Sequence, residues 1–351
     1  MEKYIYICLA LACCLGVTAL FGDGFTANPD RISDLQIHPL TNDLFQLTWN
    51  EVPGADKYRV YISGSPLATG DPGWLLWQES YIPLCYVPSS PAAAFFYVSA
   101  VHDDIGTFKF IPGGTFNNGT ANITVSPFYL DKYEVTQDGY QAVMGSNPAY
   151  GSGVGASYPV YFVTWFKAIE YCNKRSLQEG FTPCYSYLTF GTNPANWPVG
   201  WNDSNANATN ISCAWSADGY RLPTEAEWEF AARGGIFSHG YTYSGGNAID
   251  AVAWYTVNAA NASHPVGTKA PNELGLYDMS GNIREFVWDI SANYPTGDQT
   301  DPTGPATGVF RVRRGGGWWD TASACEVSAR SGNTPTTSHQ SIGFRVARRT
   351  Y

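Results

Sequence analysis

Charged side chains are scarce in this sequence, since Asp, Glu, Lys and Arg together supply 14% of its 351 residues. An average soluble domain carries about 25%, so a disordered charged tail and a coiled coil are both excluded. Basic residues are the rarer charge, and a net charge of −10 offers no footprint for nucleic acid. What is present, 44% hydrophobic residues with 36 glycines and 22 prolines, indicates a folded chain of short elements and many turns.

Residues 1–22 are predicted to be a signal peptide. Residues 4–21 contain no charge, and small side chains near position 18 offer a cleavage site. A lipid anchor at Cys13 or Cys14 and an uncleaved anchor helix remain as alternatives, and they are the only membrane contacts that we expect. Each alternative predicts an exported protein, whether periplasmic, cell-envelope or secreted.

Export changes the expected state of the cysteines, because thiols tend to pair outside the cytosol. We predict a disulfide between Cys184 and Cys213, which flank an Asn-rich insertion; closing a loop of this length is worth roughly 3 kcal/mol. An odd number of cysteines follows the signal segment, so at least one is free or pairs between molecules. These are Cys85, Cys172, Cys184, Cys213 and Cys325.

Residues 28–103 alternate between apolar and polar side chains, as half-buried strands do. Tyr58, Val60 and Ile62 give one such face. Several short strands in this length predict an all-β, immunoglobulin-like sandwich. The segment resembles a fibronectin type III domain, in which a Trp and a Tyr of neighbouring strands anchor the core, as Trp49 and Tyr58 would here.

Residues 107–351 carry three short helix signals. The strongest begins at Thr224, which has Glu227 three residues later as a capping box and Gly234 as a stop. A second is predicted for residues 165–177 after an N-capping Thr164, and a third for residues 136–144. The remainder reads as strands, turns and loops.

A series of motifs runs in order through this second region. They are IPGGTF (111–116), YEVT (133–136), GYRLPTEAEWE (219–229), NELGLYDMSGN (272–282), RGG (314–316) and IGFR (342–345). The series resembles the formylglycine-generating enzyme family, also called sulfatase-modifying factor. The resemblance implies an α+β fold of the C-type-lectin-like kind, poor in regular structure.

The resemblance also implies a chemistry to look for. Active members oxidise a cysteine in a Cys-x-Pro-x-Arg segment to formylglycine, with copper held by two cysteines that follow the Gly-Gly turn. Here Cys325 stands at the second position and Asp320 at the first. A carboxylate is a hard ligand that monovalent copper does not favour, so the catalytic role of Cys325 is the alternative hypothesis. A buried structural cysteine is the other interpretation.

Calcium is a further candidate cofactor. Asp278, Asn282 and Glu285 put oxygen ligands in one short turn, where the resemblance also implies a calcium ion. Capping and turn formation are the competing roles of such residues. Seven arginines near the C-terminal end predict internal ion pairs or, alternatively, an anionic ligand: Arg311, Arg313, Arg314, Arg330, Arg345, Arg348 and Arg349.

These observations favour an exported binding or scaffold module over a copper oxidase. Its expected contact surface includes Trp318, Trp319 and Asp320, because aromatic side chains at a turn on a rigid scaffold suit a peptide, protein or glycan ligand. Formylglycine generation by Cys325 is the alternative function. A divergent iron-dependent oxidoreductase is a third hypothesis, but the five histidines show no metal-binding spacing.

Overall fold

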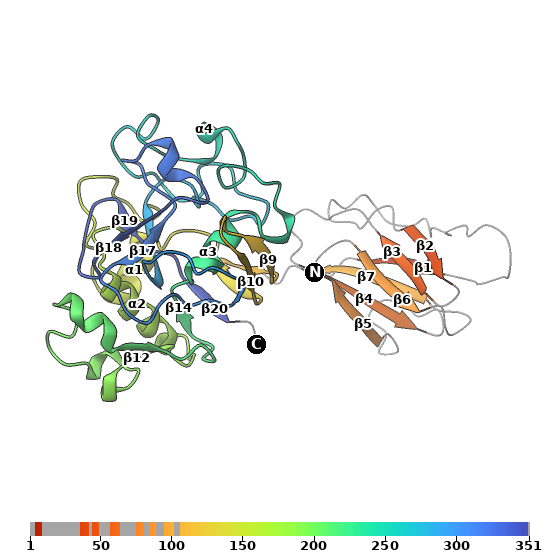
Figure 1. Ribbon diagram of the computed structural model, residues 1–351, viewed down its shortest axis with the longest axis horizontal. Coiled ribbons are helices and arrows are strands. Elements are labelled where there is room, and N and C mark those ends of the chain that lie inside the picture. The colour runs from red at the N-terminus through yellow and green to blue at the C-terminus, as the bar shows by residue number, and fades with distance from the viewer. Residues whose placement is uncertain are drawn as a thin grey trace. The chain divides into compact units, whose positions relative to one another are not determined.

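The structure is a computed structural model that describes residues 4–8, 36–41, 44–48, 57–63, 75–80, 84–88, 95–101 and 106–349. The chain divides into two compact units, Met1–Asp104 and Ile105–Tyr351 (Figure 1). Among the described residues, no helix combines the length and apolar character that a membrane span requires.

The described part of the first unit consists of strands in two antiparallel sheets. One sheet has the order β1 (Tyr4–Cys8), β7 (Phe95–Val101), β4 (Lys57–Ser63) and β5 (Leu75–Ser80), and the other β2 (Gln36–Thr41), β3 (Leu44–Thr48) and β6 (Leu84–Pro88). Tyr58 and Val60 of β4 are buried, as the alternation predicts. The fibronectin type III assignment stays a prediction, because Trp49 lies outside the described residues.

Strand β1 falls within the predicted signal peptide. Its residues pair with β7, with Tyr6 opposite Tyr97. Residues 9–35 lie outside the described part of the chain, so cleavage and export stay predictions.

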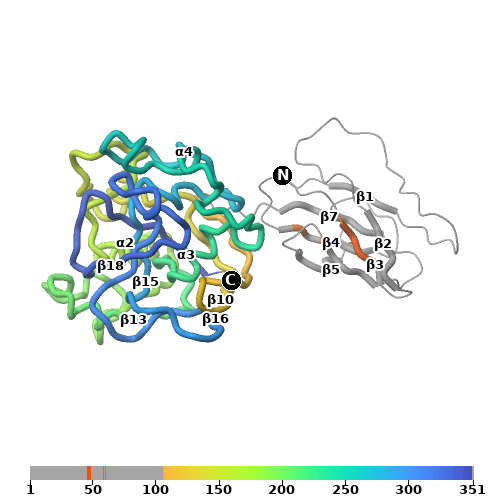
Figure 2. Tube along the Cα trace, turned by 45° about the horizontal axis from the view of Figure 1, so that its top comes forward, coloured from red at the N-terminus to blue at the C-terminus, as the bar shows by residue number. Residues whose placement is uncertain are grey.

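The second unit is built from short strands, short helices and long loops, which the tube in Figure 2 follows. Its sheets have the orders β14-β20-β11-β8, β18-β17-β15-β19, β16-β10-β9 and β12-β13. The strands are β8 (Phe108–Ile111), β9 (Gly114–Asn117), β10 (Asn122–Val125), β11 (Phe128–Asp131), β12 (Tyr185–Tyr187), β13 (Ile211–Cys213), β14 (Tyr220–Arg221), β15 (Arg284–Ile290), β16 (Gln299–Thr300), β17 (Arg311–Arg314), β18 (Arg330–Asn333), β19 (Ile342–Gly343) and β20 (Ala347–Arg349).

The three predicted helices are all present. The helices are α1 (Gln137–Met144), α2 (Trp165–Gln178), α3 (Glu225–Ala232) and the single turn α4 (Ile249–Val252), with 3₁₀ turns at Leu188–Phe190, Pro194–Asn196, Asn205–Asn210, Gly235–Phe237 and Ala322–Cys325. Thr224 caps α3 through its side chain, and Glu227 returns a bond to the Thr224 N–H, so the predicted capping box is confirmed.

Helix α3 lies at the centre of the core of the second unit, next to β10 (Figure 1). Trp228 and Phe230 are fully buried and pack with Ile123, Leu130 and Val312 in one cluster. Burying aromatic side chains of this size is worth about 1.5–3 kcal/mol each, so this helix fixes the strands and turns around it. The candidate functional site is built on these strands and turns.

Candidate functional site

The turn after β17 positions the predicted site residues. Gly315 and Gly316 both have positive φ, at 89° and 67°. A Cβ on Gly316 would lie 2.7 Å from Cys325 Sγ, so only glycine fits there. The Trp318 N–H donates to Asn282 O at 2.7 Å, which anchors the chain as it leaves the turn.

After this turn, the side chains of Trp318 and Trp319 point in different directions, one into the core and one toward solvent. Trp318 is 2% exposed, packs with Ile283, and its indole N–H donates to Gln340 O at 3.3 Å. Trp319 is 58% exposed and meets Trp318 edge to face, with ring centroids 5.4 Å apart. Of the three residues predicted for the contact surface, only Trp319 is therefore exposed to solvent. The buried Trp318 packs against it.

Asp320 is buried and forms an ion pair with Arg284. Its Oδ2 atom is buried and has no hydrogen-bond partner among the described residues. Burial, together with the neighbouring Arg284, lowers the pKa of Arg313 to about 10, while Asp320 opposes this. Burial also lowers the pKa of His339, assisted by Arg284 and Arg313. One carboxylate thus lies beside two guanidinium groups, which leaves an excess of one positive charge, while the lowered pKa of His339 keeps its imidazole uncharged at neutral pH.

Cys325 lies beneath the Gly-Gly turn and is fully buried. Burial raises the pKa of its thiol to about 12, and the nearby Asp320 carboxylate adds to this. Without a metal the thiol is therefore protonated at neutral pH, and copper binding would have to displace this proton. With Asp320 already paired to Arg284, these residues do not form the two-thiolate pair that monovalent copper prefers.

The three residues predicted for calcium are engaged separately. The Glu285 carboxylate pairs with Arg345, and the Asp278 carboxylate accepts from Gly267 N at 2.7 Å. Asn282 donates to Glu134 through its side-chain amide at 2.7 Å. Asp278 and Asn282 both have positive φ, near 59°, which is the turn-forming role of such residues. The described residues also contain no cluster of three or more His, Cys, Asp or Glu side chains able to hold a metal ion.

Cys184 and Cys213 are not joined in the structure, and the disulfide between them stays a prediction. Cys213 of β13 lies opposite Tyr185 of β12, the residue that follows Cys184. Burial raises the pKa of the Cys213 thiol, and the nearby Cys184 adds to this. The Cys184 thiol donates to Gly219 O at 3.3 Å.

Sequence reasoning missed an aromatic surface connected to the turn. Tyr150, 70% exposed, stacks on Phe162 with ring centroids 4.6 Å apart. Phe162 N donates to His339 O, and the adjacent Gln340 accepts the Trp318 indole N–H. No pattern in the sequence indicates that segments so far apart in the chain come together. In the structure, Phe162 has a positive φ of 59°, which is uncommon for a bulky residue.

Comparisons with known proteins place the second unit in a family. The Sulfatase-modifying factor enzyme 1-like domain matches residues 98–350. Chaperone protein LppX of Paenibacillus barcinonensis is 39% identical over 253 residues, covering 66% of this chain and 84% of that protein. Formylglycine-generating enzyme of Thermomonospora curvata is 31% identical over 290 residues, covering 68% and 91%. The solved structure of Treponema denticola variable protein 1 is 35% identical with a TM-score of 0.63, covering 69% of this chain and 95% of that one. The chain belongs to the sulfatase-modifying factor family, and its second unit has the fold of the formylglycine-generating enzymes.

Proposed function

We propose that this protein is an exported binding module whose contact surface is centred on Trp319. The observation that carries the proposal is the 58% exposure of Trp319 on a turn held by buried groups. An exposed aromatic side chain on a rigid support contributes contact area at a low entropic cost. Tyr150 is a second exposed aromatic side chain, and it is linked to this turn through Phe162 and His339.

The charge beside Trp319 favours an acidic peptide or glycan as the ligand. The two guanidinium groups of Arg284 and Arg313 outnumber the single carboxylate of Asp320 there. Arg313 Nε is buried and has no hydrogen-bond partner among the described residues. Guanidinium groups bind carboxylate and sulfate oxygens through paired hydrogen bonds, so such groups on a ligand would complete this patch.

Formylglycine generation remains the alternative function. Relatives named formylglycine-generating enzymes favour it, whereas the relative named a chaperone protein favours a non-catalytic role. The single thiol of Cys325 and the Asp320–Arg284 pair argue for binding, because together they do not supply the two thiolates that monovalent copper prefers.

The test is a screen of wild-type protein against a glycan array and a displayed peptide library, repeated with Trp319→Ala. We expect ligands enriched in carboxylate or sulfate groups, and a loss of affinity of at least about tenfold in the variant. Val199→Ala is the matched control, since Val199 is also an exposed apolar residue. Ligands that bind Trp319→Ala as tightly as wild type would place the contact surface elsewhere.

Export is part of the same proposal and rests on residues 1–22. The first unit would then act as a spacer or a second binding domain. N-terminal sequencing of the protein recovered from the envelope and the medium of an expressing host tests this. An intact N-terminus on protein found only in the cytosol would contradict it.

A further inference from the structure

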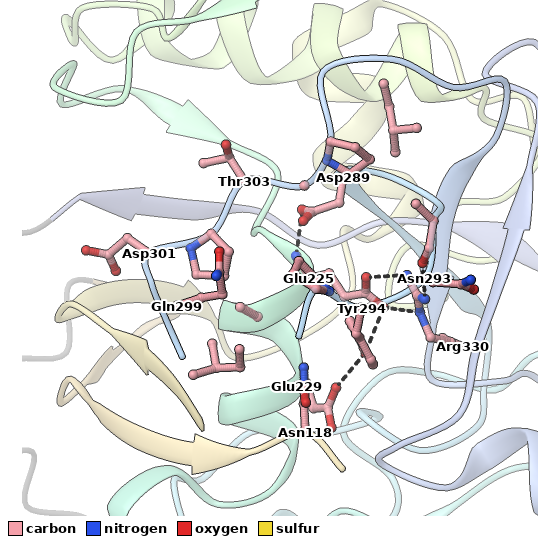
Figure 3. A pocket seen from close by; sticks show the side chains of 18 of the residues that line it. Asn118, Glu225, Glu229, Asp289, Asn293, Tyr294, Gln299, Asp301, Thr303 and Arg330 are labelled. Carbon is pink, nitrogen blue, oxygen red and sulfur yellow. Dashed lines mark hydrogen bonds and ion pairs between the residues drawn. The ribbon is translucent and has the colours of Figure 1, made fainter. Parts of the chain in front are cut away.

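A cavity separate from Trp319 lies between helix α3 and the segment 289–305, which begins with the last two residues of β15. Its volume is about 400 Å³, within the range of about 300–1,000 Å³ typical of small-molecule sites. Neither Trp318, Trp319 nor Asp320 lines it. Figure 3 shows its side chains, with Glu225, Tyr294 and Arg330 grouped together and Asp289 directed at the backbone of Glu225.

Apolar groups form much of the cavity wall. Phe116 and Ile123 come from β9 and β10, Ala226 from α3, and Ile290 from the end of β15. Tyr294 adds an aromatic ring, and its hydroxyl is held by Arg314 Nη2 at 2.9 Å. Such walls suit a ligand with an apolar body.

Two of the four carboxylates in the cavity wall are already neutralised. Glu225 receives two bonds of 2.7 Å from Arg330, and Glu229 pairs with Arg233 at 2.7 Å. Arg314 lies behind both, 3.1 Å from Glu225. These ion pairs form the fixed floor of the cavity and leave neither glutamate free for a ligand.

Asp289 is different, because it is 4% exposed and forms no ion pair with any described residue. Its Oδ2 atom accepts from Glu225 N at 2.7 Å, and its Oδ1 atom accepts nothing from the described part of the chain. Gly304 packs against it so closely that a Cβ there would lie 2.9 Å from the Asp289 side chain. A carboxyl oxygen that has no donor and belongs to a residue in the wall of a cavity is a vacant acceptor position for a ligand.

We propose that this cavity binds a small primary amine with an apolar body, and that Asp289 Oδ1 is the counter-ion and acceptor for its ammonium group. The apolar walls hold the body of the ligand, and the neutralised floor does not compete for the cation. The remaining carboxylate, Asp301, is occupied by Ser126, whose N–H and hydroxyl both donate to it at 2.6 and 2.7 Å.

The affinity for the amine should depend on pH, because Asp289 has a raised pKa. Burial, and then the nearby Glu225 and Glu227 of α3, raise the pKa of Asp289 to about 8, while the Glu225 N–H and Arg311 of β17 oppose this. Asp289 is therefore mostly protonated near neutral pH, and an ammonium group must displace that proton. Affinity should rise about tenfold per pH unit up to about pH 8 and then level off.

The experiment is calorimetric titration of the full chain with tryptamine and with its neutral isostere tryptophol. Buffers of different ionisation enthalpy report the protons released. We expect tryptamine to bind at least about tenfold more tightly than tryptophol at about pH 8, and to release about one proton at about pH 7. The amide resonance of Glu225, which reports the bond to Asp289, should shift on binding.

Three variants separate this proposal from a purely structural role of Asp289. Asp289→Asn keeps an acceptor for Glu225 N but should remove the preference for tryptamine and the proton release. Ala226→Leu should block both probes by filling the cavity, and Asp138→Asn, a surface carboxylate, should change nothing. Equal affinity for the two probes, no tryptamine binding up to about 10 mM, or unchanged tryptamine affinity in Asp289→Asn would overturn it.

Discussion

Arg345 and Glu285 form an ion pair in which both side chains are fully buried, with Nη2 and Oε1 2.7 Å apart. Trp228 of α3 donates its indole N–H to the second oxygen of Glu285 at 2.7 Å. Arg345 also donates to Tyr277 O at 2.8 Å. The pair and these bonds therefore connect three of the sequence motifs, GYRLPTEAEWE, NELGLYDMSGN and IGFR, at one point in the core.

Glu285→Gln should destabilise the protein by about 3–5 kcal/mol, because it leaves Arg345 as an uncompensated buried charge. Urea denaturation followed by tryptophan fluorescence measures this. Lys167→Gln is the control: its ion pair with Glu170 is half-exposed and should be worth less than about 1 kcal/mol. Equal losses in the two variants would show that the buried pair is not a structural anchor.

Trp318 and Trp319 should respond oppositely to truncation. Trp318→Ala removes a buried ring and should cost about 3–5 kcal/mol, whereas Trp319→Ala should change the free energy of unfolding by less than about 0.5 kcal/mol. Thermal and chemical unfolding of both variants test this. A large loss of stability in Trp319→Ala would mean that this side chain is part of the core and not a free contact.

Cys325 should resist alkylation in the folded protein. Burial raises the pKa of its thiol to about 12, so at about pH 8 the thiolate fraction is on the order of one in ten thousand. Iodoacetamide labelling with peptide mapping, native against urea-unfolded, measures the protection. Labelling of native Cys325 at the unfolded rate would reveal an accessible thiolate and would favour the oxidase alternative.

Stability should fall as pH rises through the range set by Asp289. Its pKa is raised to about 8 in the folded state, so between the unfolded value near 4 and about 8 the folded state holds the extra proton. Raising the pH across this window therefore favours unfolding, by up to about 1.4 kcal/mol per unit.

Asp289→Asn should remove this contribution, so that its stability declines less than that of wild type between about pH 6.5 and 7.5. Asp131 and Asp278, whose pKa values are raised to about 6, act mainly below this window. Parallel pH profiles of wild type and variant would show that Asp289 does not carry the raised pKa.

Local signals in the sequence were sufficient for the helices. Thr224 and Glu227 lie three residues apart and form the capping box without help from distant segments. The predicted family was likewise carried by contiguous motifs, and the comparisons confirm it. The internal ion pairs predicted for the arginines are present at Arg314, Arg330 and Arg345.

The site could not be predicted in the same way, because it depends on contacts between distant segments. The partner of Glu285 is 60 residues away, and the opposite directions of Trp318 and Trp319 follow from a turn anchored to Asn282 O. The surroundings of Cys184 and Cys213 likewise depend on strand register, which places Tyr185 opposite Cys213 and which sequence proximity does not reveal.

A Cys-x-Pro-x-Arg peptide distinguishes a binding module from a copper oxidase, because only the oxidase would convert its cysteine. The copper-treated full chain is incubated with the peptide and oxygen beside a Cys325→Ser variant, and the peptide is analysed by mass spectrometry. We expect the cysteine to stay unconverted in both samples. Conversion to the aldehyde by wild type that disappears in Cys325→Ser would contradict it and assign catalysis to that buried thiol.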